Sequence, residues 1–272
     1  MINWLNGALA TCSFELRRSF TFQRTAVSVV LALFPPVMMG LLILGTEMSG
    51  EPQARAGIQE FSKLITILLV SLVCILSLLL WATPNVSSEL EGKSWNFVAS
   101  RPGGRISIFL GKFLASFLIS FAISVSAISL CILLANARLG IDDAQSLWLA
   151  LCGVYFLACN AYAAVFSLIG TFFIKRAMVV GAGYIIGSDL VMASIPSALI
   201  NKITIRHHLQ EIGINWIGWF IPGSTEQEFR EVFGQGMPVI AHILIVVGIT
   251  VVSLALGAWI IVNREYITSD QT

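Results

Sequence analysis

Three groups of residues in this sequence have types and spacings that could do chemistry. The first is Gly92-Lys93-Ser94, which has the same ending as a phosphate-binding loop. A phosphate-binding loop also needs a glycine five residues before the glycine of its Gly-Lys pair. Here that position, 87, is Ser, and no strand is expected before it. We therefore expect the chain to bind no nucleotide by itself and to carry no cofactor.

The second group is His207, His208 and Glu211, which could suggest a metal site or a membrane protease. Their spacing is not His-Glu-x-x-His, no second acid lies in a matching apolar block, and the residues fall in an expected loop. His242 lies near the start of the last apolar block, where a buried or interfacial histidine is typical. We predict neither a catalytic residue nor a metal site.

The third group lies inside apolar sequence and centres on Asp189. A central Asp costs on the order of 2.5–3.5 kcal/mol on insertion scales, so it normally faces a cavity or a partner. Alternatively, the helix breaks near Gly187-Ser188 and Asp189 caps a new turn. Asp189 and Asn160 are candidates for a translocation pathway, and Gly183 with Gly187 forms a GxxxG pair that permits close helix contact.

Composition places the surrounding elements in a membrane. The chain is 57% hydrophobic and 11% charged, with mean hydropathy +0.86, which excludes a water-soluble domain. A net charge of +1 does not indicate nucleic acid as a partner. A bilayer span takes about 20 residues, and six blocks qualify: Ala26–Gly45, Leu64–Thr83, Ile106–Leu134, Leu147–Ile174, Ala177–Ile200 and Met237–Val262. We expect an all-α, polytopic membrane protein with six transmembrane helices in one domain, residues 1–272.

The first 25 residues are predicted to form an amphipathic interfacial helix rather than a signal peptide. Their basic residues come late, and apolar residues recur at helical spacing: Ile2, Leu5, Leu9, Cys12, Leu16 and Phe20. Such a helix lies along the inner leaflet. The five cysteines show neither CxxC nor Cys/His spacing, so they are expected to be small buried hydrophobic side chains.

A polar segment, residues 84–112, separates the second and third blocks. Within it Ser87–Val98 can form a short helix with Glu89 and Lys93 on its charged side. The order of Glu, Gly-small, apolar run, Pro, Arg and then Gly-Lys resembles the cytoplasmic loop of ABC type-2 permeases, the membrane subunits of ATP-binding-cassette exporters. The residues that match are Glu89 or Glu91, Gly92, Ser94, Pro102, Arg105, Gly111 and Lys112.

The resemblance implies a function and partners. In that family the loop carries a coupling helix that docks on a separate ATPase subunit, and an elbow helix often opens the chain. The coupling residues implied here are Glu89, Glu91, Gly92, Lys93, Trp95, Pro102 and Arg105. The implied partners are the ATPase subunit, a second permease copy or a paralogue, and membrane lipids. ATP and Mg would bind the ATPase subunit, so this chain would be a transporter permease and not an enzyme.

The basic residues predict the orientation. With the N-terminus inside, ten fall in inner segments: Arg17, Arg18, Arg24, Lys93, Arg101, Arg105, Lys112, Lys175, Arg176 and Arg264. Six fall in outer segments: Arg55, Lys63, Arg138, Lys202, Arg206 and Arg230. The positive-inside rule then places both termini in the cytoplasm and the protein in the cell's cytoplasmic (inner) membrane.

The longest extracytoplasmic loop is residues 201–236. It contains Trp216, Trp219 and Phe220, which either mark the membrane interface or belong to a re-entrant hairpin that caps the route. Two other classes of protein remain as alternatives. A membrane-embedded enzyme or assembly factor would need no ATPase, and a secondary transporter should show inverted repeats and mid-span ionisable residues, of which only Asp189 qualifies.

Overall fold

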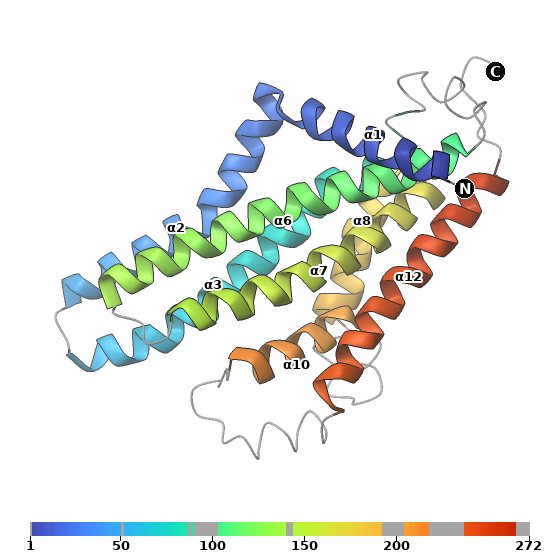
Figure 1. Ribbon diagram of the computed structural model, residues 1–272. Helices are drawn as coiled ribbons and strands as arrows, with labels where there is room; N and C mark the ends of the chain where they lie inside the picture. Colours follow the sequence, from blue (N-terminus) through green and yellow to red (C-terminus); the bar gives the residue numbers. More distant parts are fainter. Residues whose placement is uncertain are drawn as a thin grey trace.

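The computed structural model describes residues 2–49, 52–85, 87, 89, 103–139, 144–191, 204–217 and 237–264. Every regular element in these ranges is helical, which confirms the predicted all-α class (Figure 1). The elements are α1 (Ile2–Ser19), α2 (Phe22–Ser49), α3 (Pro52–Trp81), the 3₁₀ turn η1 (Thr83–Asn85), α6 (Gly104–Leu139), α7 (Ala144–Phe172), α8 (Ala177–Tyr184), the π-helix η2 (Ile185–Val191), α10 (Ile205–Ile217) and α12 (Val239–Asn263).

Among the described residues, four helical stretches are long and apolar enough to cross a membrane: Phe22–Gly45, Gly104–Arg138, Ala144–Phe172 and Val239–Asn263. Two shorter apolar stretches, Ile67–Trp81 and Ala177–Ser188, belong to the second and fifth predicted spans. The fifth departs from a regular α-helix because α8 continues as the π-helix η2. The rest of that predicted span, 192–200, lies outside the described residues.

The core lies where α3, α6, α7 and α12 pack together. Phe166, Leu78 and Ile128 are fully buried there. Tyr155 is a polar side chain of the core with a partner: its hydroxyl donates to the Ile67 carbonyl at 2.7 Å. The cysteines behave as predicted, since Cys152 is half-buried and the others are buried. The contact between two of them, with 3.3 Å between the sulfurs of Cys74 and Cys159, was not predicted.

Helix α1 packs along α6, as Figure 1 shows, but not through its leucine stripe. The buried face carries Ala8 and Cys12, whereas Leu5 and Leu9 are exposed. The reason is close approach: a Cβ added at Gly111 of α6 would lie 2.6 Å from the Ala8 carbonyl oxygen. Small side chains therefore face the protein and the leucines face outward. The helix also ends at Ser19, earlier than the predicted residue 25.

The two ends of the bundle are distinct. The α1 end comprises α1, the end of α3, the start of α6 and the ends of α7 and α12; the α10 end comprises α10 and the starts of α7 and α12. At the α1 end, Arg105 Nη1 donates to the Val262 carbonyl of α12 at 3.0 Å. Arg264 Nη1 likewise donates to the Phe172 carbonyl of α7 at 2.7 Å. These bonds satisfy carbonyls that a helix end leaves without an intrahelical partner.

Candidate functional site

A buried lysine is the centre of the candidate site. Lys112 lies in the third turn of α6, the most apolar kind of environment in this chain, and only 5% of it is exposed. An isolated ammonium group in such a place is very unfavourable, so a buried cation is normally paired with carboxylates. The pairing partners of Lys112 therefore determine which segments must lie together.

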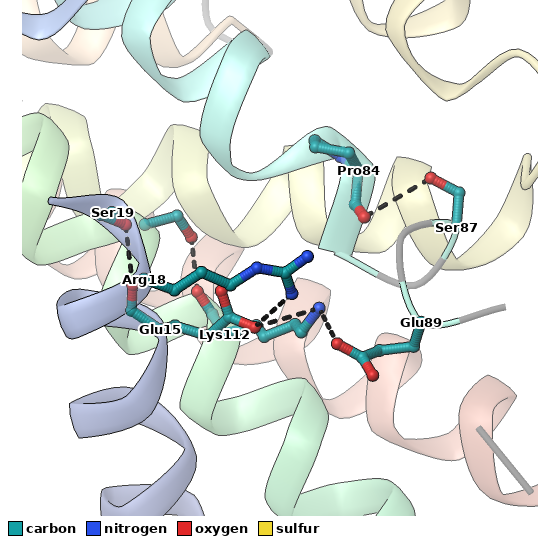
Figure 2. Close-up of polar contacts among 8 residues, drawn as sticks. Glu15, Arg18, Ser19, Pro84, Ser87, Glu89 and Lys112 are labelled. Carbon is teal, nitrogen blue, oxygen red and sulfur yellow. Dashed lines mark hydrogen bonds and ion pairs between the residues drawn. The ribbon is translucent and has the colours of Figure 1, made fainter. Parts of the chain in front are cut away.

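Two carboxylates from different segments hold this lysine (Figure 2). Lys112 Nζ lies 2.6 Å from Glu89 Oε1, which follows the end of α3, and 3.4 Å from Glu15 Oε1 of α1. Arg18 adds a longer contact of 3.8 Å to the same Glu15 oxygen. We call Glu15, Arg18, Glu89 and Lys112 the ionic cluster. It joins α1, the start of the 84–112 segment and α6.

Local sequence explains why these groups meet. Gly111, directly before the lysine, leaves room for the backbone of α1, so Glu15 can reach Lys112. After α3 ends at Trp81, η1 turns the chain, and Ser87 Oγ donates to the Pro84 carbonyl at 3.4 Å. The short 3₁₀ turn thus brings Glu89 back over α6. The two residues of the Gly111-Lys112 pair have separate roles. The glycine allows the close approach of α1, and the lysine supplies the buried charge.

Two of the predicted coupling residues, Glu89 and Arg105, belong to the described part of the chain. Glu89, expected on the charged side of the coupling helix, lies 2.6 Å from Lys112 of the same chain. Arg105 contacts the end of α12 inside the same chain. The other coupling residues lie outside the described residues: Glu91, Gly92, Lys93, Trp95 and Pro102.

Sequence reasoning missed Glu15 as a site residue. It is a nearly buried acid on α1, on the same face as Ala8 and Cys12, which are also buried. An acid placed three residues after Cys12 on the face with small side chains is the signal that could have found it. The exposed members of the apolar stripe, such as Leu5 and Leu9, drew attention to the opposite face of the helix.

The two predicted pathway residues lie on two different elements. Asn160 is half-buried in the middle of α7. Asp189 lies on the π-helix η2, and its side chain is outside the described residues. Gly183 and Gly187 show no close packing, because a Cβ added to either would meet no described atom within 4 Å. Close approaches occur instead at Gly7, Gly111, Gly153, Gly170, Gly181 and Gly257.

All three histidines of the chain converge at the α10 end. His207 and His208 lie on helix α10, which corrects their predicted placement in a loop. They meet His242 in the first turn of α12; His208 Nδ1 and His242 Nδ1 are 2.8 Å apart, and His242 is 3% exposed. We call these residues the histidine cluster. Within the described residues no group of three His, Cys, Asp or Glu side chains is placed to hold a metal ion.

The bundle and its buried charges define a class of protein. Apolar helices of membrane-spanning length, with helix α1 packed against α6, describe a multi-pass integral membrane protein. The chain belongs to the ABC-2 family of transporter proteins, because the family's sequence model matches residues 12–265. It is thus a membrane permease of an ABC transporter and not itself an enzyme. Permeases of this family generally work with an ATPase subunit. No curated protein matches the chain.

Proposed function

We propose that this chain is the permease subunit of an ATP-driven exporter, and that the ionic cluster transmits movement of the 84–112 segment to α6 and α1. The active form contains two permease halves, each with six spans, and two ATPase subunits. Residues 84–112 carry the coupling helix and residues 1–25 the interfacial elbow. The ATPase subunits bind ATP and Mg, and this chain binds neither.

The double pairing of Lys112 is the observation that carries the proposal. One carboxylate, Glu89, belongs to the segment expected to touch the ATPase, and the other, Glu15, belongs to α1. Because the lysine is buried, moving either acid away would remove one of its two carboxylate partners, and breaking a buried ion pair costs up to about 3–5 kcal/mol. The three segments are therefore expected to move together. A movement of the loop then becomes a tilt of α6, which shifts the balance between two membrane arrangements.

The distribution of basic residues supports a cytoplasmic α1 end. Helix direction alone places eight predicted inner residues there: Arg17, Arg18, Arg24, Arg105, Lys112, Lys175, Arg176 and Arg264. Four other described basic residues belong to the opposite end by the same criterion: Arg55 and Lys63 in the first half of α3, Arg138 at the end of α6 and Arg206 on α10. By the positive-inside rule both termini are cytoplasmic and the α10 end is outside.

We assign docking on the ATPase and the substrate pathway to the residues that the sequence indicated. Glu91, Gly92, Lys93, Trp95 and Pro102 form the surface offered to the ATPase. Asp189 and Asn160 belong to the route of the substrate, and the π-helix around Asp189 supports this, since π-helical turns occur frequently at functional sites.

The test separates docking from transmission with two variants. Glu91→Arg reverses a charge of the proposed docking surface, so less ATPase should co-purify while membrane insertion stays normal. Glu89→Gln removes one acid from Lys112, so ATPase recovery should stay normal. In a variant that keeps Cys12 of α1 as its only cysteine, adding ATP should change the reactivity of that thiol. Glu89→Gln should reduce this change.

The matched control is Glu211→Gln, an acid of α10 at the other end, which should alter neither recovery nor the response of Cys12. If the variants Glu89→Gln and Glu15→Gln both keep the full ATP response, the ionic cluster does not transmit movement. If Glu91→Arg also recovers normal ATPase, the 84–112 segment is a linker and not a coupling loop.

A further inference from the structure

A cavity of about 70 Å³ lies beside the ionic cluster, where four helices meet. Arg18 comes from α1, Arg24 from α2, Trp81 from α3 and Lys112 from α6. One water needs about 10–15 Å³ by this measure, so the cavity can hold a polar group larger than a water molecule. It lies at the α1 end, where the amphipathic helix meets the spans.

The charges around the cavity favour an anion. Three described cations line it, Arg18, Arg24 and Lys112, and Glu15 is the lining acid. Glu89 is bound to Lys112, so three positive and two negative groups leave a charge of +1. A ligand with one negative charge would neutralise this group. A phosphodiester carries that charge at neutral pH.

Two hydrogen-bond donors at the cavity are suited to such a ligand. The guanidinium carbon of Arg24 lies 4.9 Å from the centroid of the Trp81 ring, which holds the arginine in place by a cation–π contact. The buried indole nitrogen of Trp81 has no hydrogen-bond acceptor within the described part of the chain. An indole N–H can only donate, and buried donors are normally paired. An acceptor oxygen from outside the chain would satisfy it.

The surroundings identify the source of that oxygen as a lipid. Leu80 and Ile119 form apolar walls of the cavity, and Leu80 is also exposed on the surface of the bundle. The corner between α1 and α2, next to Arg24 in sequence, exposes Phe20 and Phe22. Trp and Arg near a membrane surface contact headgroups, while exposed Phe and Leu contact acyl chains. A phospholipid supplies both groups, whereas free phosphate supplies only one.

We propose that this cavity binds the phosphate of an anionic phospholipid, with Arg24 and Trp81 Nε1 as its donors and Arg18 at its entrance. The bound phosphate connects the corner between α1 and α2 to the end of α3. It thereby adds a lipid contact to the elements that the ionic cluster already joins. This inference is independent of the coupling role of the 84–112 segment.

The experiment uses the delipidated, purified full-length protein in detergent, titrated separately with phosphatidylglycerol, phosphatidylcholine and inorganic phosphate. Retained lipid is counted by native mass spectrometry, and the melting temperature is followed in parallel. Phosphatidylglycerol should bind and raise the melting temperature, and the other two should do neither. Arg24→Gln should weaken binding about fivefold or more. Trp81→Phe keeps the ring but loses the N–H, and should weaken it about 2- to 10-fold.

The control is Arg17→Gln, an exposed arginine on α1 that does not line the cavity. It should bind phosphatidylglycerol as the unaltered protein does. The proposal is overturned if Arg17→Gln and Arg24→Gln weaken binding equally, since the effect would then be general surface charge. Equal binding of phosphatidylcholine would overturn it too. Saturation by inorganic phosphate at similar concentrations would show a site for a soluble anion, and the lipid assignment would be wrong.

Discussion

The two ends of the bundle each bury a polar cluster, and the clusters differ in kind. The ionic cluster holds full charges, and its two carboxylates come from α1 and from the segment after α3. The histidine cluster holds rings that can all be neutral, and it lies on two helices, α10 and α12. Along α12 the two ends lie about 30 Å apart, judged from His242 to Val262 at 1.5 Å per residue.

This difference indicates different mechanical roles. A buried charge must keep its counter-charges, so the ionic cluster forces its three segments to move as one. Two neutral imidazoles share one hydrogen bond, worth only about 0.5–1.5 kcal/mol. Helix α10 also packs against α7 and α12, and Trp216 fits against Gly153 of α7. The α10 end is thus held mainly by packing and the α1 end by charge.

The largest effect is expected from removing the buried cation. Lys112→Met removes the cation that Glu15 and Glu89 share and leaves only the longer Arg18 contact to Glu15, which should destabilise the protein by on the order of 3–5 kcal/mol. Thermal unfolding in detergent measures this. The control is Lys175→Met, at an exposed lysine in the turn between α7 and α8, which should change little. Restoring neutrality with Glu15→Gln and Glu89→Gln in the Lys112→Met background should recover part of the loss.

A smaller but still large effect is expected from closing the space between α1 and α6. A Cβ at Gly111 would press on the backbone of α1, and overpacking of this kind costs about 1–3 kcal/mol. Gly111→Ala should therefore loosen α1, whereas Gly183→Ala, with open space around it, should be neutral or slightly stabilising.

The thiol of Cys12 reports this loosening. Burial raises the pKa of the Cys12 thiol, so little of the reactive thiolate exists at neutral pH and labelling is slow. In a variant that keeps only this cysteine, labelling should speed up as pH rises, and Gly111→Ala should speed it up at fixed pH. Equal labelling rates in the Gly111→Ala and Gly183→Ala variants would show that α1 does not depend on Gly111.

The histidine cluster should give a moderate effect on stability and none on coupling. His208→Phe leaves the other ring of the pair buried with a lost partner, at about 1–3 kcal/mol. The double variant with His242→Phe should lose less than the sum of the single variants, because the second change removes a group that has already lost its bond. ATPase recovery and the response of Cys12 to ATP should be unchanged. A reduced response would show that both ends take part in coupling.

The smallest effect is expected from the exposed helix-end contacts. Arg264→Gln removes a donor to the last carbonyls of α7, and such contacts near a helix C-terminus are worth about 0.3–1 kcal/mol. Amide hydrogen exchange should rise in the last turn of α7 but not near His242. Arg176→Gln, at an exposed arginine in the adjacent turn, is the control. If Arg264→Gln lowered the melting temperature as much as Lys112→Met does, this would contradict the view that buried charge dominates the α1 end.

The sequence predicted the helical class and most spans because apolar blocks of about 20 residues have few other stable forms. It also indicated that Glu89 and Lys112 matter, as part of one loop. It did not predict that they pair, because Glu89 was expected to face the ATPase subunit from the charged side of a short helix.

Contacts between residues far apart in the sequence were not predictable from periodicity. Glu15 reaches Lys112 because small residues let α1 approach α6, which apolar spacing does not reveal. The histidines converge because residues 205–217 form a helix that packs beside α12. Pattern reasoning treated that segment as a loop, since its mixture of charged and apolar residues resembles an interfacial connection.

The π-helix η2 has a consequence for how this region tolerates insertions and deletions. A π-turn contains about one residue more than an α-turn, so it is equivalent to an inserted residue within a continuous helix. One residue corresponds to about 100° of rotation in an α-helix. In a regular α-helix a one-residue deletion turns the residues that follow by that angle, whereas in η2 the same deletion would restore α-helical winding and leave the flanking faces nearly unchanged. One-residue length variation would therefore be absorbed within this segment.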